Sequence, residues 1–280
     1  MLRILLPTDF SDNSYGAIQY TLQLFKNVAC EFSLLHIYMP PVYQAQYLAG
    51  SPGQLGLGDV VKETANTNLK KLKQRIVNEF DNEKHSFETS AYLNTLPNQV
   101  DEMVEAKNID LIVMGTQGAT GAEEILFGTH TVHIINRAKC PVLAIPPNFE
   151  YETPKEILFP TDYEIEFKPE PLKMLLELAK QHISSIEVLH VANEDNLSKK
   201  QEENKEKLNI ILEHTAHLFH EQPHQEVIHA INKFQLKHKM NLLVMIQNKH
   251  TFFQRLFIEP VIKKIGLHIT IPFMVIPHFK

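Results

Sequence analysis

The sequence repeats itself, and this repeat limits the possible folds more than any other feature. Three blocks of the first half return in the same order in the second half: Ile4-Leu-Leu-Pro-Thr-Asp9 as Ile157-Leu-Phe-Pro-Thr-Asp162, Leu35-His-Ile37 as Leu189-His-Val191, and Leu111-Ile-Val-Met114 as Leu242-Leu-Val-Met245. A length of 280 residues also suits about two domains. We therefore expect a tandem protein with domains at residues 1–146 and 155–280.

Within each copy, short apolar runs alternate with segments of helical periodicity. In the first copy these patterns predict strands near residues 2–6, 31–38, 86–92, 110–114 and 141–145, and helices near 12–26, 58–79, 97–106 and 129–138. In the second copy they predict strands near 156–159, 186–191, 225–230, 241–246 and 272–276. This alternation indicates an α/β fold of two tandem doubly wound domains, each with a five-stranded parallel sheet in the order 3-2-1-4-5.

In an open α/β sheet, ligands bind beyond the carboxyl ends of the strands, where the strand order reverses. Here the reversal falls between the first and fourth strands, so the informative residues follow Leu6 and Met114. Pro7-Thr8-Asp9 follows the first strand, Gly115-Thr-Gln-Gly118 follows the fourth, and Gly128-Thr129 begins the next helix. The sequence therefore places a candidate site between these three segments.

The glycines of this site suit phosphate binding, because without Cβ atoms the main-chain amides can approach an anion closely. The helix that starts at Gly128-Thr129 adds the positive end of its dipole. The hydroxyl of Thr129 can donate to a phosphate, and the carboxylate of Asp9 suits a ribose hydroxyl or a Mg²⁺ ion that bridges to phosphates. Simpler interpretations stay open: glycines that only form turns, Asp9 as a helix N-cap or a loop carboxylate, and Thr129 as a helix cap.

The loop is neither a P-loop, since no lysine follows the glycines, nor a dinucleotide fingerprint, since it follows the fourth strand. Instead, Met114-Gly115-Thr-Gln-Gly118-x9-Gly128-Thr129, the ending Cys140-Pro-Val-Leu-Ala-Ile145 and the opening Ile4-Leu-Leu-Pro-Thr-Asp9-Phe-Ser11 resemble the ATP-binding motif of the universal stress protein family. The resemblance covers both halves of the chain, and so indicates a tandem member of that family.

The resemblance implies an adenine nucleotide, with ATP favoured and AMP, ADP or a cyclic dinucleotide as alternatives. The residues that it implies as contacts are Pro7, Thr8, Asp9, Ile37 at the adenine, Met114, Gly115, Gly118, Gly128, Thr129 and, through its backbone, His130. Two of them depart from the family's habit: serine is also common in place of Thr129, and an apolar residue is usual in place of His130.

The last strand of such a sheet is an exposed edge unless something covers it. The resemblance implies that this strand pairs with its equivalent in a dimer. In a tandem chain the pairing becomes internal, with Val142 to Ile145 beside Phe273 to Ile276, and gives a pseudo-twofold arrangement. Further association into a homodimer stays open.

The second copy has lost the glycine loop. When the two copies are aligned without a gap, the second copy has Ile246 in place of Gly115, Lys249 in place of Gly118, Glu259 in place of Gly128 and Pro260 in place of Thr129. The new side chains block the approach of a phosphate, and the carboxylate of Glu259 repels it. We therefore expect that the second domain does not bind ATP in the family's manner, while some other anion at Lys249 remains an alternative.

Four histidines, His214, His217, His220 and His224, cluster near the end of a predicted helix. Their spacing allows a zinc site, but imidazoles that complement a helix C-terminus are the favoured interpretation. His36 and His190 recur between apolar residues of the second strand in each copy, and we expect both to be satisfied strand histidines.

Cys30 and Cys140 lie in apolar, strand-like contexts and are expected to be buried free thiols, as in a reducing compartment. A net charge of −6 argues against a general nucleic-acid surface. No apolar run approaches the ~20 residues needed to cross a membrane. These observations predict a soluble cytoplasmic protein that binds neither nucleic acid nor membrane.

The leading hypothesis is an ATP-binding stress-response protein, a nucleotide-dependent regulator or sensor that acts on an unidentified protein partner through its first domain. A slow ATPase or nucleotide hydrolase is the first alternative, although the sequence offers no obvious base for activating water, and we assign no catalytic residue. A scaffold that binds no nucleotide is the second alternative, against which the intact glycines argue.

Overall fold

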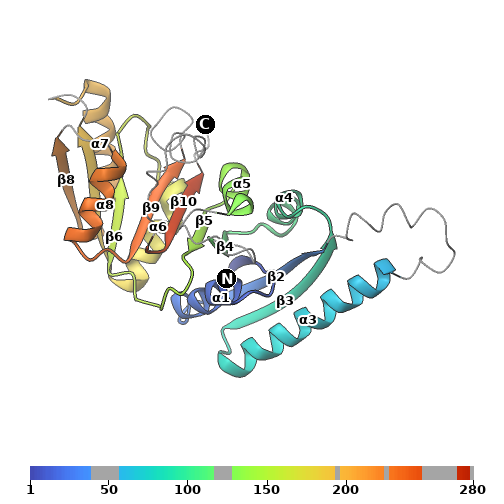
Figure 1. The fold of residues 1–280 in the computed structure, drawn as a ribbon. Helices are drawn as coiled ribbons and strands as arrows, with labels where there is room; N and C mark the ends of the chain where they lie inside the picture. The colour runs from blue at the N-terminus through green and yellow to red at the C-terminus, as the bar shows by residue number, and fades with distance from the viewer. Residues whose placement is uncertain (39–56, 117–127, 193–195, 224–226, 248–269, 278–280) are drawn as a thin grey trace. The chain divides into compact units, whose positions relative to one another are not determined.

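The computed structural model describes residues 1–38, 57–116, 128–192, 196–223, 227–247 and 270–277 (Figure 1). The described residues up to 140 form one compact unit, and those from 141 onward form a second. Each unit contains strands of a parallel sheet and the helices that connect them.

The first unit alternates strands with helices. Its elements are β1 (Leu2–Pro7), α1 (Asp12–Leu24), β2 (Cys30–Tyr38), α3 (Leu57–Glu79), β3 (His85–Leu93), α4 (Leu96–Lys107), β4 (Leu111–Gly115) and α5 (Thr129–Arg137). β2 pairs with β3, β1 with β2, and β4 with β1, all in parallel. The expected strands and helices of this copy are confirmed to within about two residues at each end, which is the usual scatter of element boundaries.

The second unit begins with the last strand of the first copy. Its elements are β5 (Val142–Ile145), β6 (Glu156–Pro160), α6 (Pro169–His182), β7 (Ser185–Ala192), α7 (Lys199–Leu212), β8 (His217–Pro223), α8 (Val227–Lys237), β9 (Leu242–Gln247) and β10 (Phe273–Pro277). β9 pairs in parallel with β10 and β6, and β7 in parallel with β6 and β8.

The strand order is β3-β2-β1-β4-β5 in the first copy and β8-β7-β6-β9-β10 in the second, within one ten-stranded sheet. Both halves therefore confirm the predicted order 3-2-1-4-5. β5 and β10 run antiparallel, with Leu143 opposite Met274 and Ala144 opposite Phe273. This is the strand pairing that the sequence predicted for an internal pseudo-dimer.

One predicted strand is wrong. The third strand of the second copy was expected near 225–230, but β8 ends at Pro223 and α8 begins at Val227. α8 buries Ala230, Ile231 and Phe234, a spacing that fits one helical face. A short apolar run rich in β-branched residues is ambiguous between strand and helix, and here the helical spacing decides.

The first strand shows how the sheet is stabilised. Ile4, Leu5 and Leu6 are all fully buried, so both faces of β1 are covered. Parallel sheets with covered faces need such continuous apolar runs, and each buried side chain contributes about 1.5–3 kcal/mol. Cys30 and Cys140 are buried and free, as expected, and burial raises the pKa of each thiol to about 12.

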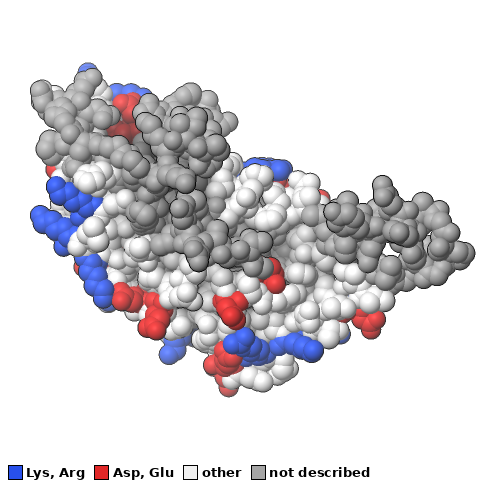
Figure 2. Space-filling view, in the orientation of Figure 1, with Lys and Arg blue, Asp and Glu red and all other residues white. Residues whose placement is uncertain are grey.

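Charged side chains of both signs are interspersed on the face drawn in Figure 2. Ion pairs also join segments distant in sequence, such as Arg137 with Asp101 and Lys207 with Glu166. The mostly exposed run Lys199 to Lys207, which carries charges of both signs, forms the first part of α7. Among the described residues, no helix is long and apolar enough to span a bilayer.

Candidate functional site

The candidate site lies where β1 and β4 end. These strands are parallel neighbours, with Ile4 opposite Leu111 and Leu5 opposite Ile112. The residues that follow them therefore emerge at the same edge of the sheet, at the point where the strand order reverses. The turn after β1 and the start of α5 belong to the same compact unit as both strands.

The turn after β1 is fixed by hydrogen bonds around Thr8. The Thr8 amide donates to the Leu35 carbonyl at 2.8 Å, and the Thr8 hydroxyl accepts from the Phe10 amide at 3.0 Å. The same hydroxyl lies 3.0 Å from the buried hydroxyl of Ser14. Phe10 has a φ of 65°, a left-handed conformation that is unusual for a bulky residue and needs such support.

Asp9 is exposed at the centre of this turn. Its Oδ1 atom accepts from the Ser11 amide at 3.0 Å and from the Ser11 hydroxyl at 2.5 Å. Partial burial raises the pKa of Asp9, but the hydrogen bonds from Ser11 and Ser14 outweigh it and hold the pKa below 3.8. Asp9 is therefore anionic at neutral pH, as contact with a ribose hydroxyl or Mg²⁺ requires, and it also has the local bond expected of a loop carboxylate. Ser11 is the N-cap residue of α1, and its side chain accepts from the Ser14 amide.

Asn13 is a site residue that the sequence analysis missed. A Cβ atom on Gly115 would lie 2.5 Å from Asn13 Nδ2 and 2.8 Å from Asn13 Cγ, so the absence of a side chain on Gly115 makes room for this carboxamide. Asn13 lies in the first turn of α1, beside the last residue of β4. No pattern in the sequence marks it, because its contact with Gly115 joins segments about 100 residues apart.

The end of β4 is tied to the start of α5. The Thr131 hydroxyl donates to the Gly115 carbonyl at 3.0 Å, and the Gly128 amide donates to the Thr116 carbonyl at 2.6 Å. Met114 and Thr131 are buried. The helix N-terminus is therefore held beside the carboxyl end of β4, where the sequence places it.

Gly128 is the N-cap residue of α5, with φ −57° and ψ 147°, and no side chain caps the helix. Thr129 is thus the first helical residue, and the interpretation of Thr129 as the cap is wrong. Thr129 and His130 are both exposed. Their amides lie at the positive end of the helix dipole, the arrangement that attracts anions in many proteins.

The remaining predicted residues lie as follows. Pro7 is buried at the end of β1. Ile37 is half-buried on β2, two residues beyond Leu35, which is the partner of Pro7. Gly118 lies outside the described residues. The structure thus brings the β1 turn, the end of β4 and the start of α5 to one edge of the sheet.

The second copy repeats the β1 turn closely after β6. The Thr161 amide donates to the Leu189 carbonyl at 2.9 Å, and the Thr161 hydroxyl accepts from the Tyr163 amide at 3.1 Å. Tyr163 has a φ of 55°, and Asp162 Oδ1 accepts from the Glu164 amide at 3.0 Å. The turn therefore forms in a copy that has lost the glycines.

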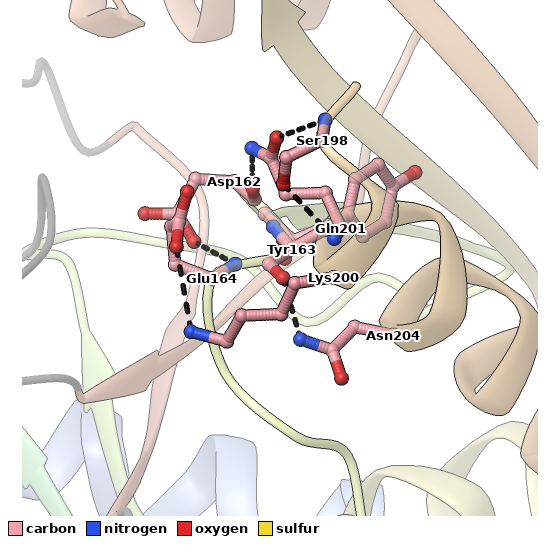
Figure 3. A network of polar contacts seen from close by, with 8 residues as sticks. Asp162, Tyr163, Glu164, Ser198, Lys200, Gln201 and Asn204 are labelled. Carbon is pink, nitrogen blue, oxygen red and sulfur yellow. Dashed lines mark hydrogen bonds and ion pairs between the residues drawn. The ribbon is translucent and has the colours of Figure 1, made fainter.

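The second copy differs in what packs against this turn. Figure 3 shows side chains from the start of α7 reaching its backbone. Gln201 Nε2 donates to the Asp162 carbonyl at 2.9 Å, and Asn204 Nδ2 donates to the Tyr163 carbonyl at 2.8 Å (Figure 3). Tyr163 is fully buried, and burial raises the pKa of Asp162. Equivalent carboxyls thus have pKa values shifted in opposite directions.

The glycine replacements of the second copy are only partly described. Ile246 is half-buried near the end of β9, where Gly115 ends β4. Lys249, Glu259 and Pro260 lie outside the described residues.

The histidine cluster does not lie on a helix. His217 and His220 belong to β8, which pairs with β7 from Ile186 onward. Side chains alternate between the two faces of a strand, so residues three apart point to opposite faces. His220 Nε2 lies 2.5 Å from Glu187 Oε2, and His217 Nε2 lies 3.0 Å from Asn209 Oδ1. Within the described part of the chain, no group of three or more His, Cys, Asp or Glu residues could hold a metal ion. His224 falls outside that part.

The two strand histidines are satisfied, as expected. His36 Nδ1 lies 2.8 Å from the Thr8 carbonyl, and His190 Nδ1 lies 3.0 Å from the Thr161 carbonyl. Each ring also packs on the left-handed residue of its turn, Phe10 or Tyr163.

Known solved structures share this architecture over the whole chain. A universal stress protein from Archaeoglobus fulgidus superimposes with a TM-score of 0.67 at 18% identity, covering 99% of this chain and 96% of that one. A functionally unknown protein, PA1789 from Pseudomonas aeruginosa, gives a TM-score of 0.61 at 13% identity, covering 98% and 92%. At these identities the likeness concerns the fold, and it extends over both copies.

Sequence relatives match about half of the chain. Universal stress protein MJ0531 from Methanocaldococcus jannaschii is 34% identical over 147 residues, which are 51% of this chain and 81% of that protein. Universal stress protein YxiE from Bacillus subtilis is 26% identical over 147 residues and is 97% covered. The model of the universal stress protein family matches residues 1–146. Together with the duplicated fold, these matches show that the chain is a tandem member of the universal stress protein family.

Proposed function

We propose that the first copy binds ATP and acts as a nucleotide-dependent regulator or sensor. The observation that carries this proposal is the convergence of three segments at the β1–β4 reversal point: the Thr8–Ser11 turn, the buried Gly115 and the uncapped start of α5. Such an edge, with main-chain amides and an anionic carboxylate, suits a ribose joined to phosphates.

Each residue has a stated role in this proposal. The amides of Thr129 and His130 and the Thr129 hydroxyl receive the phosphates, and Gly128 leaves the helix start without a competing side chain. Asp9, held anionic by Ser11, contacts the ribose hydroxyls. Met114 and Ile37 contact the adenine base, and Pro7 and Thr8 contact the nucleotide from the turn after β1. Gly118 belongs to the loop by its place in the motif alone.

Mg²⁺ prefers carboxylate and phosphate oxygens as ligands. A Mg²⁺ ion that arrives with ATP would therefore be held by the phosphates and Asp9. Asp9 is the residue of the described site that fits this role. AMP, ADP and a cyclic dinucleotide share the adenine, ribose and phosphate chemistry, and competition measurements rank them against ATP.

We favour the regulatory function over hydrolysis, because the site residues that the structure describes include no lysine and only one carboxylate. Asp9 is the one carboxylate among them, and its low pKa makes it a weak base. In the proposed function, ATP changes what the first domain presents to a protein partner, and the second domain does not bind ATP in this manner.

The proposal is tested on the purified full chain. Mass spectrometry of the denatured protein is expected to find retained adenine nucleotide, and calorimetry is expected to find one ATP site per chain. ADP released at a steady rate would favour the ATPase alternative. Neither retained nucleotide nor heat of binding would overturn the proposal in favour of the scaffold.

The position of the phosphates is tested by introducing at Gly128 the glutamate that the second copy has at the aligned position, Glu259. Gly128→Glu places a carboxylate beside the phosphates, and two such charges ~4 Å apart repel by about 4 kcal/mol at an effective dielectric near 20. We expect ATP binding to be lost. Gly128→Gln, which adds the same bulk without charge, is expected to bind more tightly than Gly128→Glu. The backbone of Gly128, at φ −57°, accepts either residue. Equal affinity of Gly128→Glu and wild type would refute the placement of the phosphates.

A further inference from the structure

His36 is the side chain from β2 that reaches the turn around Asp9. Its Nδ1 atom lies 2.8 Å from the Thr8 carbonyl oxygen. A carbonyl oxygen can only accept, so Nδ1 carries the proton and donates. The imidazole ring packs on Phe10, with 4.4 Å between ring centroids. His36 therefore contacts the residue before Asp9 and the residue after it.

These contacts act on a turn that needs support. Phe10 holds a left-handed conformation, which is unfavourable for a bulky residue and persists only where its surroundings enforce it. Asp9 lies between the two residues that His36 fixes, and its carboxylate direction is set by the same turn through Ser11. A change in the backbone of Thr8 or Phe10 therefore moves the Asp9 carboxylate.

We propose that His36 is a positioning residue, which holds Asp9 in the orientation that nucleotide binding requires without touching the nucleotide itself. This inference rests on the proposed function of the first copy. The chain supplies its own control, because His190 makes the same two contacts in the second copy, 3.0 Å to the Thr161 carbonyl and 4.8 Å to the Tyr163 ring. His190 thus supports an equivalent turn at which no nucleotide is proposed.

Three variants of the full chain separate positioning from general stability. His36→Leu removes the donor, His36→Asn keeps a donor nitrogen close to the place of Nδ1, and His190→Leu removes the matched donor of the second copy. Urea unfolding shows what each change costs the fold, and calorimetric titration with ATP shows what it costs the site. A net hydrogen bond of this kind corresponds to about a fivefold to tenfold change in an equilibrium constant.

If His36 positions Asp9, His36→Leu weakens ATP binding about fivefold to tenfold, His36→Asn recovers most of the affinity, and His190→Leu leaves it unchanged. If His36 is only structural, His36→Leu and His190→Leu both lower the urea midpoint and neither alters the affinity of the folded protein. That second result overturns the inference.

A measurement without nucleotide distinguishes this inference from the proposed function. In a carbon-13 NMR titration of the Asp9 carboxyl, His36→Leu is expected to bring the pKa of Asp9 back towards 3.8, because the bonds from Ser11 loosen. His190→Leu is expected to leave it in place. An unchanged Asp9 pKa in His36→Leu overturns the positioning role even where wild type binds ATP, whereas wild type that binds no ATP refutes the proposed function whatever the titration shows.

Discussion

The hydroxyl of Thr131, in the first turn of α5, donates a hydrogen bond of 3.0 Å to the carbonyl of Gly115, the last residue of β4. Both residues are buried, so the bond is protected from water. The bond ties the start of α5, whose first amides are not capped by a side chain, to the end of β4. The main-chain bond from Gly128 to Thr116 joins the same two segments, so one side chain and the backbone together hold the helix N-terminus.

Replacement of Thr131 by valine keeps the shape of the side chain and removes the donor. The Gly115 carbonyl then loses a buried partner, and we expect a loss of about 1–2 kcal/mol in the free energy of unfolding. Urea denaturation measures it. Thr129→Val, a matched change at the exposed neighbouring threonine, is expected to stay within about 0.5 kcal/mol. Equal costs for the two variants would mean that the Thr131 bond does not stabilise the fold.

Gly115→Ala is expected to destabilise the protein through Asn13. The added methyl group would lie 2.5 Å from Asn13 Nδ2, and the carboxamide has to move. Because the clash involves the far end of a flexible side chain, we expect a cost of about 1 kcal/mol, at the low end of the range for overpacking. The double variant with Asn13→Ala is expected to relieve the cost, so that a double-mutant cycle gives a coupling energy well above its error. Additive effects would contradict the contact.

Most of the fold could be predicted from the sequence, because its central strands are buried on both faces. Runs such as Ile4 to Leu6 are wholly apolar, and they locate β1 without ambiguity. β8 could not be located in this way. It is the outermost strand of its half of the sheet, its only large apolar residues are Leu218 and Phe219, and Leu218 is 60% exposed. An edge strand with little buried surface has only a weak hydrophobic pattern in the sequence. The apolar start of α8 has a stronger one, and the sequence therefore predicts the strand there.

The candidate site could be predicted where it depends on backbone chemistry. Glycine at 115 and 128 and the carboxylate at 9 are residue types that the chemistry of phosphate and ribose requires at the ends of strands. Contacts between side chains distant in sequence could not be predicted. The bond from Asn204 to the Tyr163 carbonyl spans 41 residues, and the place of Asn13 beside Gly115 follows from how α1 packs on β4.

Asn204 is expected to be a main stabilising contact of the second copy. Its side chain is 4% exposed, and Nδ2 donates to the carbonyl of the left-handed Tyr163. Asn204→Ala leaves that carbonyl without this donor, so we expect a loss of about 1–3 kcal/mol in the free energy of unfolding, measured by urea denaturation. Glu203→Ala, one residue earlier on the exposed face of α7, is expected to change it by less than about 0.5 kcal/mol. A cost for Asn204→Ala as small as that of the control would show that the network in Figure 3 does not stabilise the turn.

Asp9 and Asp162 are expected to affect stability in opposite directions. For Asp9, the hydrogen bonds from Ser11 outweigh burial and lower the pKa in the folded protein, so ionisation stabilises the fold above pH 3.8 and this gain is lost as the pH falls through the lowered value. For Asp162, burial raises the folded pKa, so the ionised carboxylate costs stability at neutral pH. The cost disappears as the pH falls through the raised value towards 3.8 and below.

Replacement of each aspartate by asparagine, which has nearly the same shape but no charge, separates the effects of Asp9 and Asp162. At pH 7, Asp162→Asn is expected to raise the urea midpoint and Asp9→Asn to lower it, because the first removes a desolvated charge and the second removes a hydrogen-bonded one. Below about pH 3, where Asp162 is protonated in both states, the gain of Asp162→Asn is expected to vanish, and the loss of Asp9→Asn is expected to shrink. Shifts of the same sign at pH 7 would contradict the difference between the two turns. They would mean that neither the burial of Asp162 nor the hydroxyl bond that Ser11 makes to Asp9 alone changes the electrostatics of the turn.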